Sequence, residues 1–188
     1  MEFETHRLSV REFSPADVVS IHDIATADGF VFYNLDGTED SSQAFVDRAI
    51  DLQTADVRDS FKMAVEDKTR PGHCIGYVSI DDIGGDEPGQ PDVGYLIDPR
   101  EQGQGFATEA MVGLMQNVFH THPAIGVVWL TVHPENIASQ KVASRLTFEQ
   151  VGTKEITTAH GQEPRLVYKT DRDRFTAEHG ALECLIEQ

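Results

Sequence analysis

Between residues 100 and 110 the chain reads Arg-Glu-Gln-Gly-Gln-Gly-Phe-Ala-Thr-Glu-Ala. Gly103 and Gly105 let this backbone turn tightly and bring its N–H groups close to a ligand. The stretch leads into a predicted helix, and the first amides of a helix, with the positive end of its dipole, attract anions. The segment is therefore either an anion-binding loop or a plain glycine turn between a strand and a helix.

The elements on either side of this loop predict a strand–helix–strand unit. From Gly105 to His120 the apolar residues recur as pairs every four positions, which is typical of an amphipathic helix. Val127–Val132 is an almost unbroken apolar run and is predicted to be a central strand covered on both faces. A crossover of this length favours parallel pairing of Asp92–Ile97 with Val127–Val132.

Further strands and helices are predicted around this unit from hydrophobic patterning and from turn residues. Ser14-Pro15 offers a cap and a first-turn proline for a helix to about Ala27, and Asn136 caps a helix to Leu146. Another helix is predicted at Gln43–Thr54, and strands are predicted at Leu8–Glu12, Phe61–Glu66, His73–Asp82, Glu149–Thr157 and Arg165–Lys169, the last two joined around His160-Gly161. Gly84–Pro91 is predicted to be an irregular loop.

Length and composition favour one domain of the α/β class. The chain has 188 residues, of which 39% are hydrophobic, enough for a single well-filled core. Residues 1–170 are interpreted as that domain, and the charged, weakly patterned residues 171–188 as a C-terminal appendage. No apolar run approaches the ~20 residues of a membrane span and the N-terminus is charged, so we expect a cytoplasmic protein that does not bind membranes.

The two cysteines, Cys74 and Cys184, lie far apart and have no second pair near them. They indicate neither a disulfide framework nor a cysteine-based metal site. Histidines and acidic residues also show no cluster with metal-ligand spacing, so no metal is expected.

The net charge is strongly negative. With 32 Asp and Glu against 15 Lys and Arg, the formal charge is −17. Such a surface repels the phosphates of nucleic acids and of anionic lipids, so neither is an expected partner. The charge is explained either as a solvated surface suited to a salty cytoplasm or as a field that attracts cationic amine acceptors.

Two common nucleotide-binding motifs do not fit the glycine loop. A dinucleotide-binding fingerprint needs a third small residue where Thr108 stands and an acidic residue about 20 positions further on. A phosphate-binding P-loop needs Gly-Lys-Ser or Gly-Lys-Thr, which is absent.

The pattern Arg-x-x-Gly-x-Gly between a strand and a helix instead resembles motif A of the GNAT superfamily of N-acetyltransferases. A second segment, from Val132-His133-Pro134-Glu135-Asn136-Ile137-Ala138-Ser139 to Leu146-Thr147-Phe148, resembles motif B of that family at the expected distance downstream. The opening Thr5–Arg11 is similar to the first strand of its RimJ/RimL-like branch, so the resemblance covers about residues 5 to 170. It implies an α/β fold with a mixed, mostly antiparallel sheet of six or seven strands, one splayed parallel pair and about four helices.

The resemblance also implies a binding site for acetyl-coenzyme A, the acetyl donor. The pantetheine arm would lie where the two parallel strands splay and would pair with the backbone of Leu96 and Ile97. Backbone N–H groups after Arg100 would hold the phosphates, and Asn136 would meet the pantetheine or cap its helix. The expected binding residues are Leu96, Ile97, Arg100, Gln102, Gly103, Gln104, Gly105, Phe106, Ala107, Asn136 and Ser139.

Catalysis is expected at Ser139, Asp92 and His133. Many members of the family carry a tyrosine seven residues after the asparagine, which protonates the departing thiolate, but that position is Ala143 here. In the RimJ/RimL-like branch a serine takes this role, and Ser139 stands at its position; otherwise it is a first-turn helix serine.

A base must also remove a proton from the attacking amine. Asp92 and His133 are the candidates, and the alternatives are a surface turn acid and a solvated loop residue. A further departure from the family is Thr147, which replaces a glycine.

The implied activity is direct transfer of an acetyl group to a primary amine, either a protein N-terminus or a small amine. Acceptor choice is expected to lie with the first two helices, the aromatic loop Phe30–Tyr33 and the hairpin around His160. The rival hypothesis is a non-catalytic module of the same fold that binds acyl-coenzyme A as a sensor. The aromatic loop also leaves a homodimer open.

Overall fold

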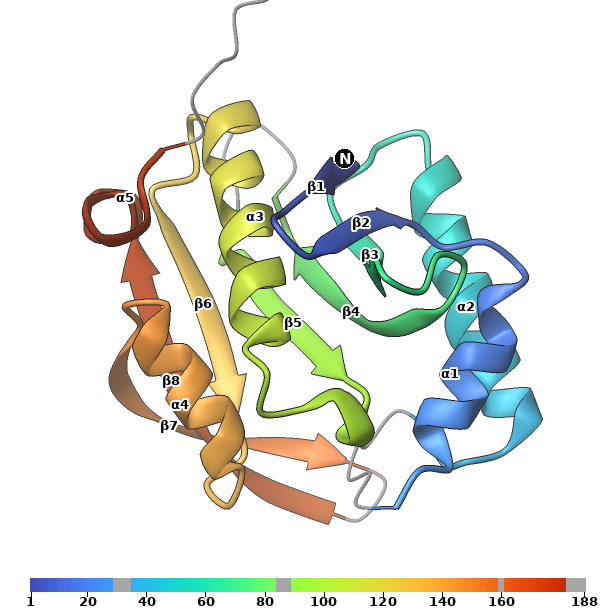
Figure 1. Cartoon of the computed structure of the whole chain (residues 1–188). Helices are drawn as coiled ribbons and strands as arrows, with labels where there is room; N and C mark the ends of the chain where they lie inside the picture. Colours follow the sequence, from blue (N-terminus) through green and yellow to red (C-terminus); the bar gives the residue numbers. More distant parts are fainter. Residues whose placement is uncertain (29–34, 84–88, 159–160, 182–188) are drawn as a thin grey trace, which may run out of the picture.

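The computed structural model describes residues 1–28, 35–83, 89–158 and 161–181. These residues form one mixed sheet of eight strands in the order β1-β2-β3-β4-β5-β6-β8-β7, flanked by five α-helices and a 3₁₀ turn (Figure 1). The strands are β1 (Phe3–Glu4), β2 (Leu8–Glu12), β3 (Phe61–Asp67), β4 (Cys74–Asp81), β5 (Asp92–Ile97), β6 (Val127–Val132), β7 (Glu149–Thr158) and β8 (Gly161–Asp171). The helices are α1 (Asp17–Ala25), α2 (Glu39–Thr54), η1 (Pro99–Glu101), α3 (Phe106–Thr121), α4 (Ile137–Arg145) and α5 (Arg172–His179).

The predicted fold is confirmed, with small differences in the elements. The additional strand is β1, whose two residues are too few to show a period in the sequence. Helix α2 begins at Glu39, four residues before the predicted start, because Thr38 caps it by accepting a hydrogen bond from Ser41 N–H. The predicted aromatic loop Phe30–Tyr33, most of Gly84–Pro91, and His160 lie outside the described residues.

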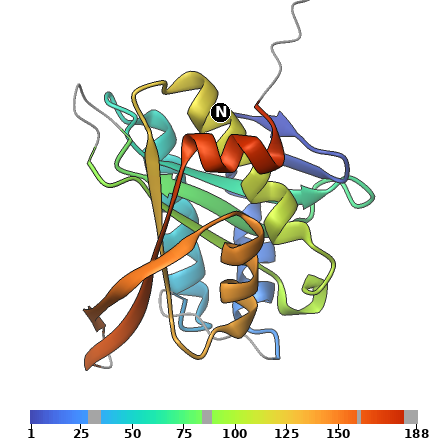
Figure 2. The same ribbon diagram turned by 90° about the vertical axis from the view of Figure 1, so that its left-hand side faces the viewer.

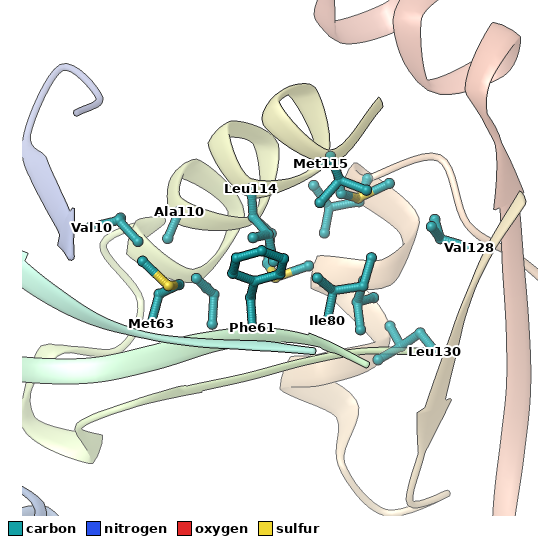
Figure 3. Close-up of a cluster of buried hydrophobic side chains, with 14 of the residues drawn as sticks. Val10, Phe61, Met63, Ile80, Ala110, Leu114, Met115, Val128 and Leu130 are labelled. Carbon is teal, nitrogen blue, oxygen red and sulfur yellow. The ribbon is translucent and has the colours of Figure 1, made fainter. Parts of the chain in front are cut away.

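The helices cover the two faces of the sheet separately. Helices α3 and α4 contribute to the larger core cluster, which also contains Val10 and Val65 of the sheet, whereas α1 and α2 pack in a second cluster with Ala64 and Leu96. Figure 3 shows side chains of α3, including Leu114 and Met115, packed over the strands. The alternation of side chains along each strand therefore assigns every sheet residue to an α3 face or an α1/α2 face.

Strands β5 and β6 form the parallel pair, and within the described residues they are paired only at Asp92 and Trp129. Trp129 N–H donates to Pro91 O over 2.7 Å, and beyond this point the strands diverge toward their carboxyl ends (Figure 1). Each strand follows its antiparallel partner, β5 along β4 from Asp92 to Ile97 and β6 along β8 from Val127 to Val132. The result is a V-shaped opening in the middle of the sheet.

A glycine on β4 lets β4 and β5 approach closely at the wide end of this opening. A Cβ atom placed on Gly76 would lie 2.0 Å from Leu96 O, so no other residue fits there without a shift of the backbone. Gly76 therefore contributes to the path of β5 at the positions that line the opening.

Helix α4 ends in a conformation that glycine normally adopts. Thr147 has φ 63°, in the left-handed region, which a β-branched residue rarely enters. Its N–H donates to Ser144 O and the next amide, of Phe148, donates to Ala143 O, which is the hydrogen-bond pattern of a Schellman motif. The Thr147 hydroxyl lies 2.9 Å from the hydroxyl of Thr170, a bond that helps to hold the strained residue.

The segment after residue 170, expected as a charged appendage, contains the helix α5. Figure 2 shows α5 following β8 and lying next to α3. Phe175 is fully buried in the main core, with its ring 5.6 Å from that of Phe119. Arg172 donates to the carbonyl oxygens of Phe119 and Ile125 over 2.7 and 2.6 Å, which fixes the helix to the end of α3 and the following loop. A charge count does not reveal such a segment, because one buried ring and one arginine hold it in place.

In the part of the chain that the structure describes, no helix combines the length and the apolar content needed to cross a membrane.

Because Phe175 is buried, Phe175→Ala should lower the free energy of unfolding by about 3–5 kcal/mol, the usual cost of such a truncation in a core. Urea denaturation followed by circular dichroism measures this change. Glu178→Ala, at an exposed position of the same helix, should change stability little. An unchanged unfolding midpoint for Phe175→Ala would show that α5 is not part of the cooperative unit.

Thr147 gives a second test, because the strain at this residue is steric. Thr147→Gly and Thr147→Ala both remove the hydroxyl, but only the alanine keeps a Cβ atom in the left-handed conformation. The glycine variant should therefore be more stable than the alanine variant by about 1 kcal/mol, the reverse of the order inside a helix. Thermal unfolding of the two proteins makes the comparison, and an alanine variant of equal or higher stability would contradict the left-handed assignment.

Candidate active site

The glycine loop between β5 and α3 begins at a capped turn. Asp98 Oδ1 accepts hydrogen bonds from the N–H and the Nε of Arg100, each at 2.9 Å, and this closes the turn η1. Gly103 and Gly105 follow with φ 79° and 84°, and Gly105 is the N-cap of α3. Gln102 precedes these glycines, Gln104 lies between them, and Phe106 and Ala107 follow, so the predicted phosphate-binding residues form one continuous loop and first helical turn. A Cβ atom on Gly103 would meet nothing within 4 Å, so the loop presents open space there.

Arg7 of the N-terminal segment holds this loop from the side. Its guanidinium lies 4.5 Å from the centre of the Phe106 ring and donates to Gln104 O over 3.0 Å and to Glu109 Oε2 over 2.7 Å. Burial alone would raise the pKa of Glu109, but hydrogen bonds from Thr5 and Arg7 lower it below its usual value. A carboxylate in the first turn of α3 would repel an anion, and Arg7 neutralises it.

Arg100 is paired with a carboxylate of its own turn. Its NH2 lies 2.6 Å from Asp98 Oδ2, and the pKa of Arg100 is raised chiefly by this hydrogen bond. The Asp98 side chain is almost fully buried, whereas the Arg100 side chain is 54% exposed. The guanidinium therefore lies at the rim of the loop with part of its charge already balanced.

Among the residues that the structure describes, the edge of β5 that faces the opening carries backbone groups without a strand partner. Asp98 N–H donates to Ile75 O, and Trp129 N–H donates to Pro91 O on the other side of β5. Because backbone groups alternate between the two edges of a strand, those of Leu96 face β4, and those of Tyr95 and Ile97 face the opening. Of the two residues predicted to pair with pantetheine, the geometry therefore favours Ile97, and Tyr95 takes the place expected for Leu96. The Gln102 side chain already donates to Ile97 O over 3.0 Å.

Ser139 lies on the first turn of α4, opposite this edge. Asn136 caps the helix, since its Oδ1 accepts from Ser139 N–H over 2.9 Å, so the N-cap role predicted for Asn136 is observed. The Ser139 Oγ lies 2.6 Å from the hydroxyl of Tyr95 on β5. The helix and the strand are thus bridged across the mouth of the opening by two hydroxyl groups.

Asp92 lies at the narrow end of the opening, where β5 and β6 still pair. Burial raises the pKa of its carboxyl to about 6, with a further increase from Asp81 on the neighbouring strand and a decrease from Lys154. A carboxyl group with this pKa is ionised near neutral pH and still takes up protons readily, as a general base should.

His133 lies at the other end of the opening, just after β6. Its Nδ1 accepts a hydrogen bond of 3.2 Å from Glu135 N–H in the turn that leads to α4. The two predicted bases are therefore not brought together, because one lies at each end of the V.

Side chains at the opening divide between the two faces of the sheet. Tyr95 and Asp92 are three positions apart on β5, so they point to opposite faces, Tyr95 toward α4 and Asp92 toward the α1/α2 side. Also on the α1/α2 side, Lys62 of β3 lies 4.5 Å from the ring centre of Phe45 and 5.5 Å from that of Tyr77. Burial lowers the pKa of Lys62.

Three residues near the opening were missed by the sequence analysis. Tyr95 was overlooked because its partner Ser139 lies 44 positions away, although a polar aromatic residue inside an apolar strand is a signal in itself. Lys62 was overlooked because its position fits the alternation of polar and apolar residues in a half-exposed strand, a pattern that indicates no functional role. The Thr108 hydroxyl is buried in the first turn of α3 and has no hydrogen-bond partner among the described residues.

Other chemistry is limited among the described residues. Burial raises the pKa of the Cys74 thiol to about 12, so this buried cysteine stays protonated; Cys184 lies outside the described residues. Within residues 1–28, 35–83, 89–158 and 161–181, no group of three or more His, Cys, Asp or Glu side chains is arranged to hold a metal ion.

A sheet opened between two parallel strands, followed by a glycine loop and a helix, defines the acyltransferase class of α/β folds. Residues 7–149 match the family described as acetyltransferase (GNAT) domain, so the chain belongs to the GNAT acetyltransferase family. It is 24% identical over 155 residues to an uncharacterized N-acetyltransferase, YnaD, of Bacillus subtilis (strain 168). The matched residues cover 81% of this chain and 85% of that protein.

Solved structures share the fold at lower identity. The ribosomal-protein-S5-alanine acetyltransferase of Vibrio fischeri superposes with a TM-score of 0.71 at 20% identity and covers 93% of this chain and 98% of its own. RimJ of Mycobacterium smegmatis, solved in complex with coenzyme A disulfide, superposes with a TM-score of 0.74 at 16% identity and covers 92% of this chain and 86% of its own.

The raised pKa of Asp92 predicts a pH-dependent stability. Between its unfolded pKa of 3.8 and its folded pKa of about 6, the folded protein holds a proton that the unfolded chain releases. The free energy of unfolding should therefore fall as the pH rises through this window. Asp92→Asn should remove this pH-dependent fall, because asparagine does not ionise. The variant should be more stable than the parent at pH ~8 by at most about 3 kcal/mol, with no gain near pH ~4.

Urea denaturation at both pH values measures this difference. Asp56→Asn, at an exposed position, is the control and should follow the parent at each pH. A gain of equal size at both pH values would show that burial of the Asp92 carboxylate is not its cause.

Proposed function

We propose that this protein transfers an acetyl group from acetyl-coenzyme A directly to a primary amine, either a protein N-terminus or a small amine. One observation carries the proposal: the open edge of β5 leads directly into a loop of glycines with positive φ at the start of α3. An extended arm with amide groups suits the first feature, and a phosphate suits the second. Acetyl-coenzyme A has both parts in one molecule.

On the donor side, the backbone of Tyr95 and Ile97 would pair with the pantetheine arm as an added strand. The N–H groups between Gln102 and Ala107 would hold the phosphates, with Arg100 at the rim. Asn136 would act by capping α4 and so placing Ser139. This assignment is supported by the unpaired edge of β5 and by the open space at Gly103.

A protein with a net charge of −17 must compensate locally for a polyanionic ligand. The ion pair with Arg7 neutralises the negative charge of Glu109 in the first turn of α3. Lys141 and Arg145 are exposed on α4, four positions apart, and would add positive charge to the surface of that helix.

On the acceptor side, the amine would enter from the α1/α2 face, where Asp92 can take its proton directly or through a water molecule. The neutral nitrogen would attack the thioester carbon, forming the N–C bond while the C–S bond breaks and its electron pair stays on sulfur. Backbone N–H groups of Tyr95 or Ile97 are the candidates for stabilising the carbonyl oxygen, in place of Leu96. Ser139 would donate a hydrogen bond to the departing sulfur.

The acceptor class is proposed from the relatives and from the chemistry of this face. The Vibrio fischeri structure is described as a ribosomal-protein-S5-alanine acetyltransferase, and a RimL structure as a ribosomal L7/L12 alpha-N-protein acetyltransferase. We therefore propose the N-terminus of a cytoplasmic protein as the first acceptor to test. Asp92, with Asp81 on the neighbouring strand, would attract an amine.

Acetyl-coenzyme A at ~100 times its dissociation constant should stabilise the protein by roughly 2.7 kcal/mol, a shift of several degrees in thermal unfolding. Gly103→Ala should lose most of this shift, because its Cβ atom would occupy the space in which the phosphates are proposed to bind. Gly180→Ala is the matched control: Gly180 has φ 75° and also no atom within 4 Å of a built Cβ, but it lies after α5. Equal ligand shifts for both variants would contradict the proposed phosphate loop.

Turnover separates the enzyme from a non-catalytic sensor. Thiol release from acetyl-coenzyme A should be observed with a panel of peptides that differ in their first residue and with small primary amines. Ser139→Ala and Asp92→Asn should each reduce it by about 10²-fold or more while the thermal shift with acetyl-coenzyme A is retained. Ligand binding without turnover on any acceptor would favour the sensor, whereas turnover untouched by both variants would contradict the catalytic roles of Ser139 and Asp92.

A further inference from the structure

The hydroxyl group that contacts Ser139 belongs to Tyr95 of strand β5, not to another residue of α4. Tyr95 OH lies 2.6 Å from Ser139 Oγ and 3.1 Å from Ser139 O. Position 143, where many family members carry a tyrosine, is Ala143, and it is fully buried in the core. A phenol therefore reaches the proposed thiolate site from β5, on the opposite side of the opening from α4.

The two hydroxyl groups at Ser139 can share their protons in two ways, because either hydroxyl can donate to the other. The Ser139 N–H is used by Asn136 Oδ1, and the oxygen atoms of Ser139 are the acceptors within reach of the Tyr95 hydroxyl. Burial raises the pKa of Tyr95 to about 12, so the phenol keeps its proton and remains a donor. When Tyr95 donates to Ser139 Oγ, the Ser139 O–H points elsewhere and can turn toward a ligand in the opening.

We propose that Tyr95 is a positioning residue that acts through Ser139: by donating to Ser139 Oγ it directs the serine O–H toward the sulfur of bound coenzyme A and strengthens that hydrogen bond. This inference rests on the proposed function, since it concerns the same donor site. As the C–S bond breaks, the electron pair stays on sulfur and the Ser139 O–H stabilises it, while the amine proton passes to Asp92. Tyr95 transfers no proton itself, because its pKa is higher than that of a thiol.

Two hydroxyl groups in series polarise one another, so the pair should stabilise a thiolate more than the serine alone. The measurable consequence is the pKa of the thiol of bound coenzyme A, which needs no acceptor. This pKa should lie below the usual value of about 8.5 for a thiol in the parent protein. Tyr95→Phe should raise it by roughly 0.5 to 1 unit, and Ser139→Ala by at least as much.

The experiment is a pH titration of the ultraviolet absorbance of the thiolate in the complex with coenzyme A, for the parent, each single variant and the double variant. The second substitution should add little to Ser139→Ala, because Tyr95 acts only through the serine. Tyr168→Phe is the control: Tyr168 is a nearby tyrosine whose charge affects the pKa of Tyr95, and no hydrogen bond joins it to Ser139 in the described residues. It should leave the thiol pKa unchanged.

The outcomes separate the two proposals. If coenzyme A fails to shift thermal unfolding of the parent, the proposed function fails. If it binds the parent and Tyr95→Phe equally at low pH but the thiol pKa is the same in both, the inference about Tyr95 alone is overturned. A merely structural role of Tyr95 would weaken coenzyme A binding at every pH and leave the thiol pKa in place.

Discussion

In the part of the chain that the structure describes, β5 and β6 pair only at Asp92 and Trp129, and this point sets the geometry of the whole site. Beyond it each strand is held along its length by an antiparallel neighbour, so the two separate and one edge of β5 is left without a strand partner. Buried backbone groups need partners, and a ligand with amide groups can supply them. The glycine loop and α3 begin where this edge ends, so the same divergence places an anion site next to an extended one.

The opening also divides the proposed reaction between two faces of the sheet. Alternation along β5 sends Tyr95 toward α4 and Asp92 toward α1 and α2, so the group that would meet the sulfur and the group that would meet the amine lie on opposite sides. The two substrates can then occupy the protein together without competing for space. The electrostatics agree with this division, because Arg7 neutralises Glu109 on the donor side, whereas burial leaves Asp92 with a pKa near 6 on the acceptor side.

The features that could be predicted from the sequence are those with a hydrophobic period or with a motif of neighbouring residues. Asp92–Ile97, Val127–Val132, the glycine loop and the Asn136 cap are read from contiguous residues, and the structure has them at those positions. Features that depend on contacts between distant segments were missed or only partly seen. They are the hydrogen bond between Tyr95 and Ser139, the burial of Phe175, and the pairing of the Leu96 backbone with β4, which turns its backbone groups away from the opening. Thr147 was predicted in part. The sequence shows that a threonine replaces the glycine usual at this position, but it does not show that the Thr170 hydroxyl contacts this threonine.

The central claim is that the opening between β5 and β6 and the loop before α3 form one binding site for acetyl-coenzyme A. Backbone amide chemical shifts, followed by nuclear magnetic resonance while acetyl-coenzyme A is added, test it residue by residue. The account predicts that the largest changes fall on the N–H groups of Tyr95 and Ile97 and on those from Gly103 to Ala107, all with the same dissociation constant. Changes confined to other parts of the chain, or separate constants for strand and loop, would contradict a single site.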